Sequence, residues 1–128
     1  HPYCVSLADL LLQKLQIVHA ADKDLKDAML LLLAGEVTPA GGNGVDSSYI
    51  ARLMADDWGF HHTATANLAK VGESAEGVAV LSAGQRERIR DSAAAILREI
   101  EKTPKSRRWN DRAKAGTSKP WYNEVADW

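Results

Sequence analysis

The chain has 128 residues, with 16 Lys and Arg against 17 Asp and Glu, so its formal net charge at pH 7 is −1. That length suits one domain, large enough to be stable without a disulfide or a structural metal. A single cysteine excludes an intramolecular disulfide and fits a reducing, cytoplasmic location, and apolar runs of only a few residues exclude a membrane span.

The hydrophobic spacing of the first third of the chain predicts two helices. Ser6 is placed to cap a first helix whose apolar residues recur at helical spacing as far as Val18. A second helix is expected from Asp22 to Ala34, with Gly35 as its stop. Its run Leu30–Leu33 covers most of the helix circumference, so we expect that helix to be buried from several sides or to meet a partner.

The middle of the chain predicts a loop and two further helices. Residues 36–44 contain proline and three glycines and are expected to form a loop. A third helix is expected to begin at Asp46 or Ser47 and to end by Gly59. A fourth is expected from His62 to Val71, and residues 73–80 are ambiguous and are interpreted as a loop.

The longest regular helix begins at a capping box, Ser82 to Gln85, and is expected to end at Thr103–Pro104. Ser106 is placed to cap a short last helix that runs through Ala115. No convincing strand is present. The sequence therefore predicts an all-α fold, a compact bundle of five to six helices over residues 1–104. Residues 105–128 are expected to be a basic, aromatic segment packed on the bundle or extending from it.

Lys14 is the most informative residue, because helical spacing places it in the middle of the apolar stripe of the first helix. A lysine there must reach water along its stem or pair with a carboxylate or phosphate. It is either a salt-bridged lysine between two helices or a cation directed into a cleft towards an anionic ligand. Asp24 and Asp27 share a face of the second helix, so in a helical hairpin one of them approaches Lys14.

The first two predicted helices resemble a known family. The blocks SLADLLLQKLQI, from Ser6, and KDLKDA, from Lys23, resemble the C-terminal helical part of nucleotidyltransferase-like proteins, in the group that includes the AbiEii-type abortive-infection toxins. The resemblance continues through Ile50–Leu53, Asp56–Gly59, Thr65–Leu68 and Pro104–Trp109. It implies that Lys14 and Asp24 are the catalytic residues that this part contributes, positioning a nucleoside triphosphate in a shared cleft.

The same resemblance implies that the catalytic half is absent from this chain. No Gly-Ser motif precedes a strand bearing an Asp-x-Asp pair, and Ala21 stands where the toxins have an arginine. Without metal-binding carboxylates a two-metal transfer cannot be assembled. The chain also lacks an initiator Met, so we expect a fragment that is inactive alone. Mg²⁺ and a nucleoside triphosphate are implied only for an active full-length protein, and no cofactor is expected here.

The C-terminal segment carries a second signal. Residues 102–119 hold seven basic residues and one acid, a net charge of +6 against −7 for the rest of the chain. Trp109, Trp121 and Tyr122 lie among or beside them. Basic residues with aromatics suit phosphate contact and base stacking, so the candidate RNA-binding residues are Arg107, Arg108, Trp109, Arg112 and Lys114. The alternative is a solvated helix whose aromatics anchor the segment onto the body.

The histidines and the cysteine indicate no metal or nucleophile site. His61 and His62 point to different faces of a helix, and His19 is expected to end the first helix, so no metal ligand spacing is present. Cys4 has no local histidine partner.

Two functions and an assembly are therefore expected. The first function is a helical accessory domain of a nucleotidyltransferase-like protein, and the alternative is a non-enzymatic helical module that binds nucleic acid or protein. Leu10–Leu12 and Leu30–Leu33 supply more apolar surface than a two-helix contact covers. With the catalytic half missing, we expect that surface to form a homodimer through residues 7–33, burying about 1,200 Å² or more.

Overall fold

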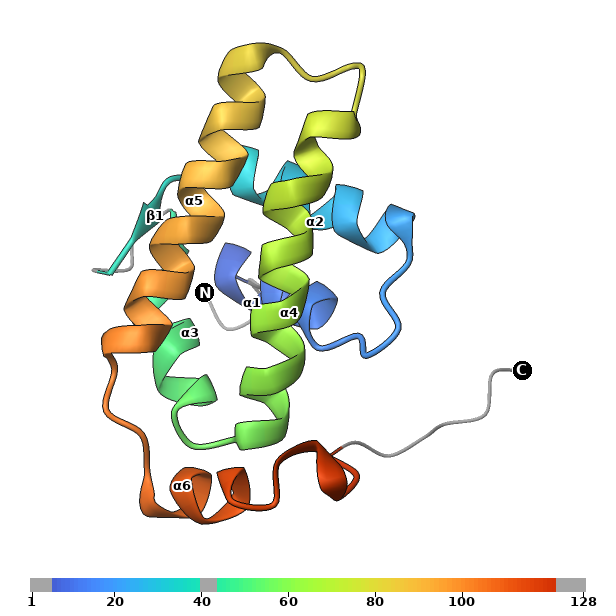
Figure 1. The fold of residues 1–128 in the computed structure, drawn as a ribbon. Coiled ribbons are helices and arrows are strands. Elements are labelled where there is room, and N and C mark those ends of the chain that lie inside the picture. The colour runs from blue at the N-terminus through green and yellow to red at the C-terminus, as the bar shows by residue number, and fades with distance from the viewer. Residues whose placement is uncertain (1–5, 40–43, 122–128) are drawn as a thin grey trace.

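A computed structural model describes residues 6–39 and 44–121. In these residues six α-helices form a bundle, and only one two-residue pair of strands is present (Figure 1), so the all-α prediction is confirmed. The elements are α1 (Leu7–Leu15), α2 (Asp22–Ala34), β1 (Val37–Thr38), β2 (Val45–Asp46), α3 (Ser47–Met54), α4 (Trp58–Ser74), α5 (Ala83–Lys102) and α6 (Arg107–Ala113), with 3₁₀ turns at Ala75–Gly77 and Gly116–Ser118.

Polar caps determine where the helices begin. In α1, α3, α4, α5 and α6 a side-chain oxygen of the N-cap residue accepts a hydrogen bond from the backbone N–H three residues on, which satisfies an otherwise unpaired donor. The predicted caps Ser6, Ser82 and Ser106 are confirmed, as is the capping box of Ser82 with Gln85. The third helix begins at Ser47, one of the two predicted starts, with Asp46 as its N-cap. The predicted bounds of α2 are also confirmed.

The first helix is shorter than predicted, because a residue distant in sequence ends it. Helix α1 stops at Leu15 rather than Val18. The side-chain amide of Asn67, in α4, donates to the carbonyl oxygens of Leu15 and Ile17, each at 2.8 Å. These hydrogen bonds stabilise a non-helical backbone conformation in the turn after α1. His19 therefore lies in the α1–α2 connection, and its predicted place at the helix terminus is wrong.

The boundary between the third and fourth helices was also predicted wrongly. Helix α3 ends at Met54, and α4 runs from Trp58 to Ser74 rather than from His62 to Val71. The carboxylate of Asp57 accepts from the N–H of Phe60 and starts the helix early. Gly59 therefore lies inside the first turn of α4 instead of ending a helix.

Two further differences concern short elements. The strands β1 and β2 pair in parallel, Val37 with Val45 and Thr38 with Asp46, although no strand was expected. A two-residue strand carries no periodicity, so the sequence pattern could not reveal it. The last helix ends at Ala113, two residues early, and is followed by Gly116 at a φ of +55°.

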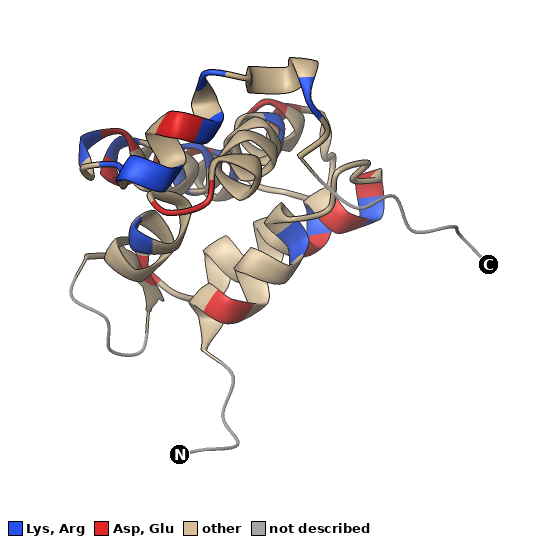
Figure 2. Cartoon of the chain, turned by 90° about the horizontal axis from the view of Figure 1, so that it is seen from below, with Lys and Arg blue, Asp and Glu red and all other residues tan. Residues whose placement is uncertain are grey.

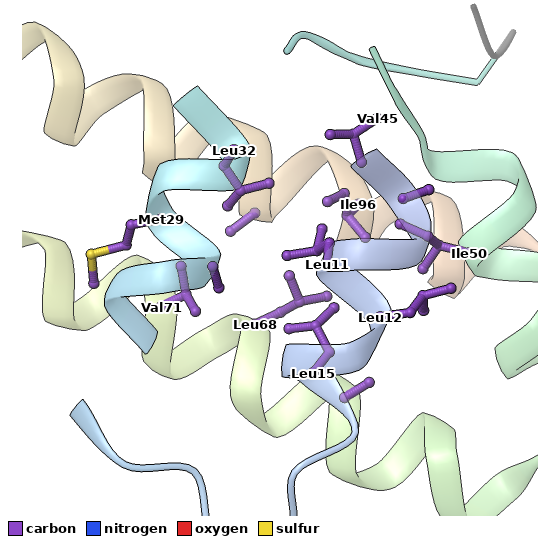
Figure 3. Close-up of a cluster of buried hydrophobic side chains, with 14 of the residues drawn as sticks. Leu11, Leu12, Leu15, Met29, Leu32, Val45, Ile50, Leu68, Val71 and Ile96 are labelled. Carbon is purple, nitrogen blue, oxygen red and sulfur yellow. The ribbon is translucent and has the colours of Figure 1, made fainter. Parts of the chain in front are cut away.

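The hydrophobic core lies where α1, α2, α4 and α5 meet (Figure 3). Side chains from each helix converge there, and all are less than 2% exposed: Leu11 and Leu15 of α1, Leu32 of α2, Leu68 and Val71 of α4 and Ile96 of α5. Val45 and Ile50 close the core on the side of β2 and α3. In Figure 1, α4 and α5 lie side by side, with α1 and α2 behind them and α6 crossing one end of the bundle.

This core uses most of the leucine surface that was expected to meet a partner. Leu11, Leu12 and Leu32 are buried within one chain, and only Leu30 of the two leucine runs is mainly exposed, at 63%. The described residues therefore lack the surplus leucine face on which the expected homodimer was based. None of the described helices combines the length and the apolar character needed to cross a membrane.

Candidate functional site

An ion-pair cluster joins α1 to α2. The Nζ of Lys14 lies 3.0 Å from Oδ2 of Asp27 and 3.5 Å from Oδ1 of Asp24. The predicted approach of Lys14 to these aspartates is thus confirmed. All three side chains are partly exposed, at 29% for Lys14, 23% for Asp24 and 34% for Asp27. The ammonium of Lys14 therefore lies at the edge of the α1–α2 pair rather than in the core.

Both carboxylates of the cluster already have partners. The hydrogen bond to Asp27, followed by the charges of Asp27 and Asp24, raises the pKa of Lys14, so the ammonium stays charged. The Oδ2 of Asp24 accepts from the backbone N–H of Ala21 and caps α2. Lys23 lies 4.0 Å from Asp27. The arrangement fits the salt-bridged interpretation of Lys14, with an oriented ammonium whose charge is already compensated.

The C-terminal segment docks on the α3–α4 corner of the bundle. The N–H of Ser106 donates to the carbonyl oxygen of Ala55 at 2.8 Å. The Nη2 of Arg108 lies 2.5 Å from Oδ2 of Asp56 and 3.2 Å from the carbonyl oxygen of the same residue. Arg108, a candidate for RNA contact, is thus engaged with the body of the protein.

Arg112 organises the turn after α6. Its guanidinium lies 4.8 Å from the centroid of the Trp58 ring, a cation–π contact. Its Nη1 donates to the carbonyl oxygen of Gly116 at 2.9 Å, and its Nη2 donates to that of Lys119 at 2.7 Å. Two of its donors therefore hold residues 116–119 close to α4.

The two tryptophans in the described part of the segment pack against adjacent histidines of α4. The ring of Trp109 meets His61 edge to face, with centroids 5.2 Å apart, and the ring of Trp121 meets His62 in the same way at 4.8 Å. The indole N–H of Trp121 also donates to Oγ1 of Thr63 at 2.9 Å. The aromatics thus anchor the segment onto the body, which is the alternative to RNA contact.

Gly59 shows how closely this segment approaches α4. A Cβ at Gly59 would lie 2.7 Å from the carbonyl oxygen of Trp121 and 3.1 Å from its Cβ, so only glycine fits without movement. The residues around this contact line a surface hollow of about 480 Å³: Asp56, Asp57, Trp58, Gly59, Arg108, Arg112, Pro120 and Trp121.

The other two RNA-binding candidates lie on the outer surface. Arg107 is exposed, and Lys114 is exposed with its Nζ 3.5 Å from the carboxylate of Asp111. Seen from below in Figure 2, α6 shows basic and acidic residues side by side. Of the candidate cations, these two are not paired with the bundle, whereas Arg108 pairs with Asp56 although its side chain stays 75% exposed.

Two residues make tertiary contacts that were not predicted from the sequence. Asn67 is 2% exposed and holds the end of α1, and the hydroxyl of Tyr49 donates to the carboxylate of Asp9 at 2.7 Å, between α3 and α1. A polar residue between Ala66 and Leu68 on α4 was the available signal for Asn67. For Tyr49 there was no signal, because its partner lies 40 positions away.

No group of three or more histidine, cysteine, aspartate or glutamate side chains in the described part of the chain could hold a metal ion. Cys4 and Tyr122, considered above, lie outside the described residues. Comparison of the sequence with protein-family models, with curated proteins and with solved structures gives no match.

Proposed function

We propose that this chain is the helical accessory domain of a nucleotidyltransferase-like protein, and that Lys14 and Asp24 face a catalytic half outside this sequence. The observation that carries the proposal is the cluster in which Asp24 and Asp27 hold the Lys14 ammonium at the edge of the α1–α2 pair. A lysine placed within an apolar stripe and fixed by two carboxylates is pre-oriented, which reduces the ordering cost of contacting an anionic ligand.

The role proposed for this domain is positioning rather than metal chemistry. The two carboxylates do not fit a Mg²⁺ site, because the Lys14 ammonium lies where a bound cation would have to lie. Lys14 would contact the phosphates of a nucleotide held by the other half, while Asp27 keeps the ammonium in place. A cytoplasmic location belongs to the same proposal and is based on the single cysteine.

The test begins with the coding sequence that surrounds this segment. If an upstream half with a Gly-Ser motif and an Asp-x-Asp strand exists, the full chain is produced and nucleotide transfer is measured. Lys14→Gln is expected to lower kcat/KM by roughly 10- to 100-fold, the size of one lost charged hydrogen bond. Lys26→Gln, on the exposed side of α2, is the matched control and is expected to have little effect.

Two results would overturn this proposal. An upstream reading frame without such a half would remove the partner that it requires. Equal activities of the wild type and Lys14→Gln, in a full chain that does transfer nucleotides, would remove the role of the lysine.

RNA contact by the C-terminal segment is the second candidate, favoured by the net charge of +6 over residues 102–119. Because Arg108 and Arg112 are held by the body, the outward cations Arg107 and Lys114 are the residues to test. Replacing both by alanine is expected to weaken binding to a single-stranded RNA and to reduce the slope of log affinity against log salt by about 1.4. The double variant of Arg88 and Arg98, on α5, removes the same charge as a control; an equal loss in both would contradict a local contact.

The partner that the main proposal requires is the absent catalytic half. A homodimer through residues 7–33 stays a weaker proposal, because Leu11, Leu12 and Leu32 are already covered.

A further inference from the structure

The contact between His61 and Trp109 holds α6 against α4. His61 is half-buried in the first turns of α4, and its ring meets Trp109 nearly at right angles, at 82°. The Nζ of Lys105, in the connection before α6, lies 5.7 Å from the centroid of the same Trp109 ring. A neutral imidazole thus shares an aromatic contact with a lysine that approaches from the docked segment.

Lys105 is fixed in this position by the end of α5. Its ammonium donates to the carbonyl oxygens of Ile100 and Thr103, at 2.7 and 2.6 Å. Ile100 lies in the last turn of α5 and Thr103 is its C-cap, so the helix dipole favours a cation at this place. Lys105 therefore cannot move away from His61 without losing these two hydrogen bonds.

The charges that face His61 come from three places. Lys105 approaches from the α5–α6 connection, Glu101 from α5, and His62 is its neighbour on α4. Burial, followed by the charge of Lys105, lowers the pKa of His61, while Glu101 acts in the opposite direction. The docked state therefore disfavours the imidazolium. Once α6 and the connection before it have undocked together, which breaks the two hydrogen bonds of Lys105, His61 is hydrated and Lys105 is distant. The ring then takes up a proton near its ordinary pKa of about 6.5.

We propose that His61 makes the docking of α6 pH-dependent, so that α6 and the segment through Trp121 stay docked above neutrality and are released in acid. Because the undocked state binds one proton more, the docking equilibrium is expected to fall by up to about tenfold per pH unit below about 6.5. The fall stops once His61 is protonated in the docked state as well. Release would separate Arg108 from Asp56 and expose both to other partners.

The test follows the 128-residue chain by NMR between pH 7.5 and 5. The ring proton signals of His61 report its protonation, and the indole N–H signal of Trp109 reports docking. In the wild type we expect the Trp109 signal to change with an apparent midpoint below 6.5. His61→Phe keeps an aromatic ring but cannot be protonated, so the acid step is expected to disappear. His19→Gln, in the α1–α2 connection, is the control and is expected to keep the step.

Two further variants change the neighbouring charges in opposite directions and leave His61 in place. Lys105→Met removes the cation, and Glu101→Gln removes the anion. The ratio of docking equilibria between pH 7.5 and 5 is expected to shrink in Lys105→Met and to grow in Glu101→Gln, by about twofold for each 0.3-unit change in the His61 pKa. The Lys105 hydrogen bonds are lost equally at both pH values, so their loss cancels in the ratio of the two docking equilibria.

Two outcomes would overturn the proposal. A measured His61 pKa at or above 6.5 would mean that the attraction between an imidazolium and the Trp109 ring exceeds the combined effect of burial and the Lys105 charge. An acid step that persists in His61→Phe would assign the release to another group. If His61→Phe fails to fold, the opposite shifts of the Lys105 and Glu101 variants decide the question.

Discussion

Asn67 is the residue whose replacement tests the packing of α1 against α4 most directly. Its side chain is 2% exposed, and its amide donates to the carbonyl oxygens of Leu15 and Ile17 at 2.8 Å each. Asn67→Ala removes both hydrogen bonds and leaves two carbonyls facing an apolar space. Each net hydrogen bond contributes about 1 kcal/mol, and a buried acceptor without a partner costs about 1–3 kcal/mol. We expect the free energy of unfolding to fall by about 2–4 kcal/mol.

Thermal and urea unfolding followed by circular dichroism measure this change. For a domain of this size, about 4 °C of Tm corresponds to 1 kcal/mol, so we expect a Tm about 8–16 °C lower. Asn110→Ala is the matched control, because that exposed asparagine donates only to the Ser106 carbonyl in its own helix. It is expected to change stability by less than about 0.5 kcal/mol.

Asn67→Asp sharpens the same test. It keeps the volume but places a carboxylate against two carbonyl oxygens, so it is expected to be at least as destabilising as Asn67→Ala at neutral pH. Because the folded state raises the pKa of such a carboxyl, stability is expected to recover as the pH falls and the acid gains a proton to donate. If Asn67→Ala stays within 0.5 kcal/mol of the wild type, the account of how α1 ends is wrong.

Three further variants probe other contacts. Leu68→Ala, in the core, is expected to destabilise the protein by about 2–5 kcal/mol in urea unfolding, and a loss under 1 kcal/mol would contradict the core described above. Gly59→Ala is expected to displace the Trp121 segment, seen as loss of the indole hydrogen bond by NMR, since its Cβ would lie 2.7 Å from the Trp121 carbonyl oxygen; an unchanged indole signal would refute the contact. Tyr49→Phe removes the main cause that lowers the pKa of Asp9. NMR titration is then expected to show a higher pKa for Asp9. The protein is also expected to lose less stability as the pH falls below about 3.8. An unchanged Asp9 pKa would exclude the hydrogen bond in solution.

Local sequence signals predicted most of the secondary structure. Ser6, Ser82 and Ser106 marked helix starts correctly, because an N-cap requires only the side chain and the backbone three residues on. The apolar spacing of α5 and the bounds of α2 were readable for the same reason. The end of α1 was predicted wrongly because its deciding partner, Asn67, is distant in sequence. The start of α4 was missed although its cap, Asp57, is a local signal.

The candidate site was predictable only in part. Helical spacing showed that Lys14 needed an anionic partner, and the hairpin placed Asp24 and Asp27 within reach. Helical spacing could not show that Asp27 is the closer carboxylate, because the distance from Lys14 to each aspartate depends on how α1 and α2 cross. The resemblance to nucleotidyltransferase-like proteins stays a prediction that only the surrounding coding sequence and the activity of the full chain can test.

The sequence by itself determined that this chain is a helical bundle, because helix period, caps and stops are local properties of neighbouring residues. The tertiary structure alone decided what its charged and aromatic residues do. The basic segment was recognisable in the sequence as a run of positive charge. In the structure, however, Arg108 and Arg112 contact Asp56, backbone carbonyls and the Trp58 ring. A count of charges cannot distinguish a cation that faces solvent from one that holds a segment, because that depends on which groups the fold brings within hydrogen-bond distance.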